Sequence, residues 1–150
     1  MKSSPLHLKN YFVTHLSVRA NQLADLSQGQ DSGGSLTTKV ENAKHAEDER
    51  QWRVAIQISC SATEKKFCPY LIEAELVGFF EADKSISDDK VEDIVAANAP
   101  ALLYSAAREL VLLVTGRGPF PPFCLPSATF IDHTPSSRKA LAESKAPVPA

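Results

Sequence analysis

The chain has few cysteines, and the three it has are not arranged as metal ligands or as a disulfide framework. Cys60, Cys68 and Cys124 contain no Cys-x-x-Cys pair and no Cys/His pairing. An odd, unpaired set favours a reducing compartment over a secreted disulfide scaffold. A chain of 150 residues buries roughly two-thirds of its unfolded surface, so it needs no disulfide or metal to fold.

The chain also has no large excess of positive or negative charge. Sixteen Lys and Arg residues against 18 Asp and Glu residues give a formal net charge of −2, which excludes a strong nucleic-acid-binding field. The longest apolar run, 110–114, has five residues, whereas a membrane helix needs roughly 20. Residues 1–16 lack the apolar core and cleavage site of a secretory leader. We therefore expect one soluble, cytoplasmic domain.

The first half of the chain does contain a regular alternation of apolar and polar residues, which is typical of half-buried strands. Strands are predicted at 6–18, 36–42, 52–62 and 68–76, with Gly78, Phe79 and Phe80 closing the sheet. A long polar connection, 21–35, separates the first two. In the first strand, one face is expected to carry Leu6, Leu8, Phe12, Leu16 and Val18, and the other His7, Lys9, Tyr11, Val13, His15 and Arg19.

A short turn around 63–66 predicts that the third and fourth strands pair as an antiparallel hairpin. Cys60 and Cys68 are about equally far from the turn, so they are expected to face each other. They are interpreted mainly as small buried hydrophobic residues, with a reactive pair as the alternative.

The apolar period changes after residue 86. Ser87 is predicted to cap a short acidic helix, and Pro100 to begin a second helix that runs to about Thr115 and stops at Gly116. This second helix is apolar around almost its whole circumference, which requires burial on both sides. A partner copy of the chain would provide the second side; burial by the chain's own N-terminal segments is the alternative. The expected oligomer interface is Leu102, Leu103, Ala106, Leu110, Leu113 and Val114.

Four prolines make 116–126 a stiff, extended connection. Its apolar residues, together with Phe130, are expected to lie along a surface or groove. Residues 131–150 are rich in Ser, Pro, Ala and Lys and are predicted to be a disordered tail with one short turn at 137–143. The domain is therefore placed at 1–130.

The sequence contains no recognisable catalytic or cofactor-binding motif. Gly116-Arg-Gly118 does not continue as a phosphate loop, and none of the four histidines has a second ligand at helical spacing. Asp132-His133 has no accompanying nucleophile elbow. The acidic residues between Glu73 and Asp93 are interpreted as a solvated face, or alternatively as a docking site for a basic partner. We expect neither an enzyme nor a cofactor or metal site.

The order of elements resembles the SecB family of export chaperones. Residues 100–109, Pro-Ala-Leu-Leu-Tyr-Ser-Ala-Ala-Arg-Glu, are similar to the family's P-x-I/L-L-F/Y-x-x-A-R-E helix, and Arg117-Gly118-Pro119-Phe120-Pro121 to its R-G-x-F-P segment. The resemblance covers about 6–130. It implies an α+β fold in which a four-stranded antiparallel sheet carries a long helix on one face, assembled as a dimer of dimers. It further implies a chaperone that holds unfolded polypeptides in apolar grooves without ATP, enzymatic activity or cofactor.

The resemblance also implies two surfaces. The family's acidic docking face for the SecA motor falls on His15, Arg19, Leu71 and Glu73; His15 and Arg19 replace acidic residues, which predicts weakened docking. The tail lacks the amphipathic helix that walls the family's groove, so a more open groove is expected. Its client-binding residues are expected among Leu23, Leu26, Leu36, Val40, Phe120, Phe123, Leu125 and Phe130. For Leu36, Val40, Phe120 and Phe123, ordinary core positions are the alternative.

Three functions remain open from the sequence. The first is a general export chaperone. The second is a specialised member dedicated to a client such as an antitoxin, which the altered docking face favours. The third is a scaffold or small-ligand-binding protein with the same fold and no chaperone activity.

Overall fold

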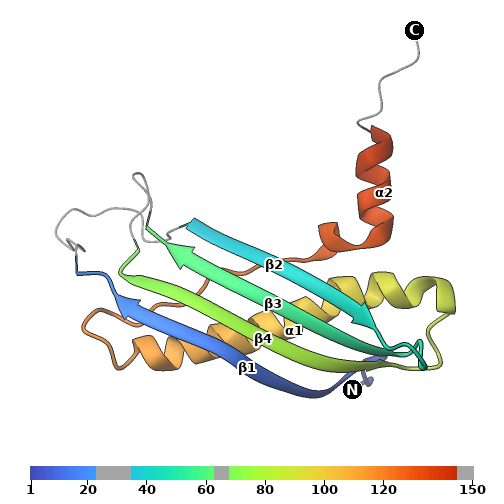
Figure 1. Cartoon of the computed structure of the whole chain (residues 1–150), viewed down its shortest axis with the longest axis horizontal. Helices are drawn as coiled ribbons and strands as arrows, with labels where there is room; N and C mark the ends of the chain where they lie inside the picture. Colours follow the sequence, from blue (N-terminus) through green and yellow to red (C-terminus); the bar gives the residue numbers. More distant parts are fainter. Residues whose placement is uncertain (23–34, 63–67, 145–150) are drawn as a thin grey trace, which may run out of the picture.

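The computed structural model describes residues 1–22, 35–62 and 68–144. Four strands form one antiparallel sheet in the order β1-β4-β3-β2, and one long helix, α1, lies across one face of it (Figure 1). The strands are β1 (Leu6–Ala20), β2 (Ser35–Lys44), β3 (Gln51–Ser61) and β4 (Tyr70–Ala82), and the helix is α1 (Asp88–Thr115). The two-layer fold predicted from the sequence is therefore confirmed.

β3 and β4 pair as the predicted antiparallel hairpin, with Ile56 opposite Leu76. Even-numbered residues of both strands are buried beneath α1, whereas most odd-numbered residues point to the open face. This alternation follows from the period of two along a strand, which places successive side chains on opposite faces.

The predicted faces of β1 are only partly right. The register between β1 and β4 shifts between Leu8 and Asn10 and again between Val13 and His15. Each β-bulge adds a residue and so reverses the alternation. Tyr11 and Val13, opposite Gly78 and Leu76, therefore lie on the helix side. Phe12 lies on the open face, where its ring packs edge-to-face on the Phe79 ring with centroids 6.2 Å apart.

The two predicted helices are one continuous helix. α1 runs for 28 residues with Pro100 in its interior, so the interpretation of Pro100 as a first-turn residue was wrong. Proline removes one backbone hydrogen bond from a helix; here Pro100 is among the buried residues of α1. Ser87 occupies the N-cap position without a side-chain hydrogen bond, and the helix ends before Gly116 as expected.

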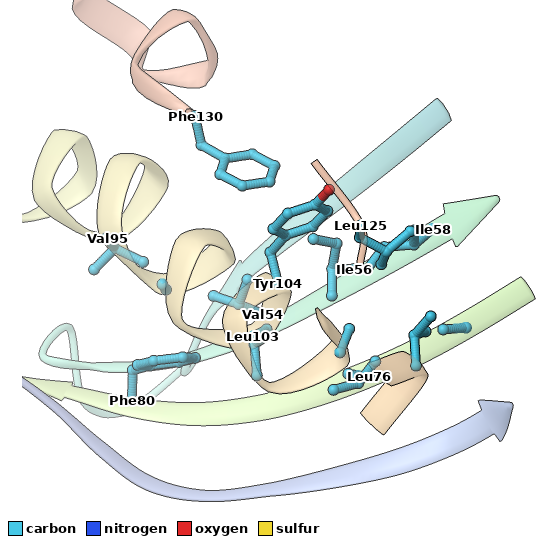
Figure 2. Close-up of a cluster of buried hydrophobic side chains, with 14 of the residues drawn as sticks. Val54, Ile56, Ile58, Leu76, Phe80, Val95, Leu103, Tyr104, Leu125 and Phe130 are labelled. Atoms are coloured by element: carbon cyan, nitrogen blue, oxygen red, sulfur yellow. The ribbon is translucent and has the colours of Figure 1, made fainter. Parts of the chain in front are cut away.

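The core lies between the sheet, α1 and the segment after it. Figure 2 shows Val54, Ile56 and Ile58 of β3 facing Leu103 and Tyr104 of α1, with Leu125 and Phe130 of the following segment closing the cluster. Residues 116–130 run back along the same face of the sheet (Figure 1). The helix and this extended segment therefore share the covering of one sheet face.

The C-terminal region differs from the predicted disordered tail. Residues Ile131–His133 form a 3-10 helix and Pro135–Ser144 form helix α2, which projects away from the sheet (Figure 1). The Ser136 backbone N–H donates to Asp93 Oδ1 of α1 at 3.1 Å, and its hydroxyl also contacts that carboxylate. The sequence could indicate only a short turn because α2 has no buried residues. The domain boundary at 130 stays a prediction.

Candidate binding surfaces

The segment 116–130 is fastened to the core by hydrogen bonds to four side chains, of which Tyr70 and Thr115 are the first two. The Tyr70 hydroxyl accepts from the Phe120 backbone N–H at 3.1 Å. The buried Thr115 hydroxyl donates to the Val111 carbonyl at 2.7 Å and accepts from the Phe123 backbone N–H at 2.9 Å. Proline-rich chain has few backbone donors of its own, so these side chains fix its path.

Two residues of α1 extend this fastening. Tyr104 donates to the Pro126 carbonyl at 2.7 Å, and Arg108 Nε donates to the Leu125 carbonyl at 2.9 Å. Burial raises the pKa of Tyr104, so its hydroxyl stays protonated as a donor. The sequence indicated no such role for Tyr104 or Arg108, although both belong to the motif that carried the resemblance.

The predicted groove residues fall into three groups. Phe123, Leu125 and Phe130 are buried in the chain's own core; their place on a client-binding surface stays a prediction that this burial does not favour. Leu36, Val40 and Phe120 are half-buried at the margin of that core. Leu23 and Leu26 lie outside the described residues. An extended apolar segment looks the same in sequence whether it lines a groove or fills a core, because both need alternate apolar side chains.

Two of the half-buried residues, Leu36 and Val40, lie on an edge strand. β2 is the last strand of the sheet, and Leu36 and Val40 stand opposite Cys60 and Ile56 of β3 on the covered face. An edge strand presents backbone N–H and C=O groups that pair with no neighbouring strand. Apolar side chains and free backbone groups therefore occur together along β2.

Of the six residues expected at the oligomer interface, three are exposed on α1, two are half-buried and one is buried. Leu102 and Leu113 are 44% and 61% exposed, Val114 is exposed, and Ala106 and Leu110 are half-buried. Leu103 is fully buried against the sheet, and a Cβ atom at Gly78 would lie 2.8 Å from its Cδ2. Leu103 therefore belongs to the core and is removed from the predicted interface.

The four predicted docking residues come together on the open face. β1 and β4 pair with His15 opposite Glu75 and Arg19 opposite Leu71, and His15 Nε2 lies 3.7 Å from a Glu73 carboxylate oxygen. A hollow of about 580 Å³ lies over this region, lined by residues that include His15, Lys39, Glu73 and Glu75. The face carries charges of both signs rather than an acidic surface.

Cys60 and Cys68 face each other as predicted, with sulfur atoms 3.7 Å apart and both side chains buried as free thiols. The hydrogen bond to Cys68 and burial raise the pKa of the Cys60 thiol. A buried protonated thiol is a poor nucleophile. Within residues 1–22, 35–62 and 68–144, no group of three or more His, Cys, Asp or Glu residues could hold a metal ion.

Comparison with known proteins identifies the family of this chain. The family model described as SecB, preprotein translocase subunit SecB, matches residues 1–133. The chain belongs to the SecB family. Among curated SecB relatives, the protein-export protein SecB of Anaplasma phagocytophilum is 31% identical over 61% of this chain and 58% of the relative. That of Haemophilus ducreyi is 26% identical over 97% and 87%.

The chain covers only 58% and 64% of the SecB proteins of Anaplasma phagocytophilum and Ehrlichia canis that it matches. Among solved structures, it is similar to the Mycobacterium tuberculosis Rv1957 SecB-like chaperone, which was solved in complex with a ChAD peptide from the Rv1956 HigA1 antitoxin. That match has a TM-score of 0.55 at 17% identity, over 83% of this chain and 91% of the other, and it shows the shared fold. Among the described helices of this SecB-family chain, none is long and apolar enough to cross a membrane.

Proposed function

We propose that this SecB-family protein is an ATP-independent, non-enzymatic chaperone that holds unfolded polypeptides in the cytoplasm. The observation that carries the proposal is the β2 margin, where the half-buried Leu36 and Val40 lie along an open strand edge. An unfolded client offers apolar side chains and unpaired backbone groups, and this margin can take both. Shallow contacts of this kind bind many sequences without a strict code.

Phe120 offers a second apolar contact, which lies against Tyr70 of β4 rather than along the β2 edge. It is half-buried and its ring packs edge-to-face on the Tyr70 ring with centroids 5.7 Å apart. Because hydrogen bonds fix the segment that carries it, Phe120 is a rigid apolar contact rather than one that must be ordered when a client binds. We propose Leu36, Val40 and Phe120 as client-binding residues, with Leu23 and Leu26 remaining a prediction.

The proposal is tested by the ability of the protein to prevent aggregation of an unfolded test protein without nucleotide. Near one tetramer per client, light scattering by the test protein should be suppressed, and added ATP should change nothing. Val40→Asp should weaken this suppression, because an apolar side chain of the client that packs there would have to displace water from a charged carboxylate. Thr37→Asp, on the same strand but exposed on the open face, is the matched control. A well-folded oligomer that does not suppress aggregation would instead favour a scaffold or small-ligand-binding protein.

We also propose that the protein assembles as a homotetramer, a dimer of dimers. The exposed apolar side chains of α1 lie on the same side of the sheet as four exposed apolar side chains of β1: Leu8, Tyr11, Val13 and Leu16. Exposed apolar surface of this extent is typical of an interaction site. A second copy would bury it and complete the covering of α1.

A dedicated client is favoured over general export by one observation. The family's acidic docking face carries His15 and Arg19 here, and a cationic partner such as SecA would meet reduced negative charge. The structurally similar SecB-like chaperone that binds an antitoxin peptide is consistent with a specialised role. Replacing both residues with acids, His15→Asp and Arg19→Glu, should strengthen binding of purified SecA at low salt. Lys84→Glu, in an exposed loop, controls for net charge, and equal binding by all three proteins would contradict the electrostatic argument.

A further inference from the structure

A second hollow lies on the molecule, at the end of the sheet away from the proposed docking residues. It has a volume of about 570 Å³, which is within the range of a peptide side chain with its neighbours or a small ligand. Its lining includes Phe79, Trp52, Arg53, Lys44, His45 and Lys9. These residues come from four strands and the β2–β3 connection, so the hollow depends on the folded sheet.

The exposed ring of Phe79 belongs to its apolar lining, and Phe12 lies beside that lining as the ring on which Phe79 packs. Phe79 is 40% exposed and packs on Phe12, which is 53% exposed. Arg53 stands directly opposite Phe79 in the pairing of β3 with β4. Both residues point to the open face, because the residues on either side of Arg53 in β3, Trp52 and Val54, are buried beneath α1. Aromatic rings exposed in a hollow are typical of a binding site rather than of a solvated sheet face.

Positive charge surrounds these rings. Lys9, Lys44 and Arg53 line the hollow together with the single carboxylate of Glu81. Lys9 lies 2.7 Å from Glu81, and Lys44 lies 3.7 Å from the exposed Glu49. Arg53 forms no ion pair within the described part of the chain. Its planar guanidinium group can bind a carboxylate through two parallel hydrogen bonds.

We propose that this hollow, lined by Phe79 and Arg53, binds an acidic peptide segment in which a large apolar side chain stands next to Asp or Glu. The apolar side chain packs on Phe79 and Phe12, and the carboxylate pairs with Arg53. Charge complementarity selects an acidic partner over a basic one. The site is separate from the β2 margin and does not require chaperone activity.

The test is a calorimetric titration with a short synthetic peptide that has Phe between Asp and Glu, and with a sister peptide that has Lys at both acidic positions. Trp52 is the only tryptophan and lines the hollow, so its fluorescence gives a second readout if the peptides contain no tryptophan. The acidic peptide should bind at least about tenfold more tightly than the basic one, and more weakly at high salt. Equal binding of the two peptides, or no binding of either, would overturn the proposal.

Matched variants locate the site. Arg53→Glu should weaken binding of the acidic peptide about tenfold, Arg53→Gln by less, and Phe79→Ser about fivefold. Arg138→Glu and Leu141→Ser change equivalent residue types that are exposed on α2 and do not line the hollow, and they should leave affinity within about twofold. If the two control variants lose as much affinity for the acidic peptide as the Arg53 and Phe79 variants do, the proposal is wrong. If Phe79→Ser instead lowers the oligomeric mass while peptide binding is unchanged, the occupant is a second copy of the chain and the proposal is wrong.

Discussion

Tyr70 holds Phe120 in two ways: the two rings pack edge-to-face, and the Tyr70 hydroxyl accepts a hydrogen bond from the Phe120 backbone N–H at 3.1 Å. The same hydroxyl can donate to the Phe120 carbonyl at 3.0 Å or to the Thr115 carbonyl at 3.2 Å. One side chain of β4 thus connects the end of α1 to the segment that follows it.

Gly118 should be intolerant of any side chain because of this contact. A Cβ atom there would lie 2.3 Å from the Tyr70 hydroxyl oxygen, and Tyr70 is buried and hydrogen-bonded, so it cannot move without losing its partners. We expect Gly118→Ala to lower the free energy of unfolding by about 2 kcal/mol, measured by urea denaturation. Gly116→Ala is the control. Its Cβ atom would lie 3.2 Å from the nearest atom, the Leu112 carbonyl oxygen, and the φ angle of Gly116 is −64°. Equal losses for the two variants would contradict the steric explanation.

Arg50 should be the most important charged side chain for stability. Its Nη1 donates to the Asp83 carbonyl at 2.9 Å and the Ile86 carbonyl at 2.8 Å, and its Nη2 contacts the Asp88 carboxylate. It therefore ties the β4–α1 connection to the start of β3. Arg50→Ala should cost about 2 kcal/mol of unfolding free energy, and Arg50→Lys should recover only part of it because one ammonium group cannot replace the guanidinium fork.

The control for Arg50 is Lys9→Ala, which removes an exposed ion pair with Glu81. Exposed pairs contribute at most about 1 kcal/mol. A larger loss for Lys9→Ala than for Arg50→Ala in thermal or urea denaturation would refute the assignment.

The three cysteines should differ in reactivity. Cys124 is exposed, whereas Cys60 and Cys68 are buried, and the raised pKa of Cys60 keeps its thiol protonated at mildly alkaline pH. Iodoacetamide should therefore label Cys124 first in the folded protein, and all three thiols should react in urea. Mass spectrometry of the labelled peptides measures this. Native labelling of Cys60 at the rate of Cys124 would show that the pair is accessible.

The assembly proposal predicts that charge on the exposed side of α1 separates the subunits. Leu102→Glu together with Leu113→Glu should raise the concentration at which the oligomer dissociates by at least about a hundredfold, because unpaired carboxylates would be buried. Size-exclusion chromatography with light scattering reports the mass. Leu141→Glu alters a comparably exposed leucine on α2 and should leave the mass unchanged; a monomeric wild-type protein would refute the proposal.

The sequence alone determined the sheet, the β3–β4 hairpin and the apolar helix, because periods of two and 3.6 follow from local backbone geometry. It also predicted that Cys60 and Cys68 lie close together, and their sulfur atoms are 3.7 Å apart, although the hairpin register pairs Cys60 with Ile72. The family resemblance, carried by 100–109 and 117–121, is likewise a property of the sequence.

Only the tertiary structure decided which apolar residues are available to a partner. Leu103 and Leu113 are both leucines in an apolar stretch of the same helix, and the sequence does not distinguish them. Leu103 is buried against Gly78 and Leu113 is exposed, because α1 can present only one side to a single sheet. The β-bulge between Leu8 and Asn10 moved Phe12 to the open face beside Phe79. The reason is general: periodicity specifies that a side chain is apolar on one face of its element, but burial depends on which other elements cover that face.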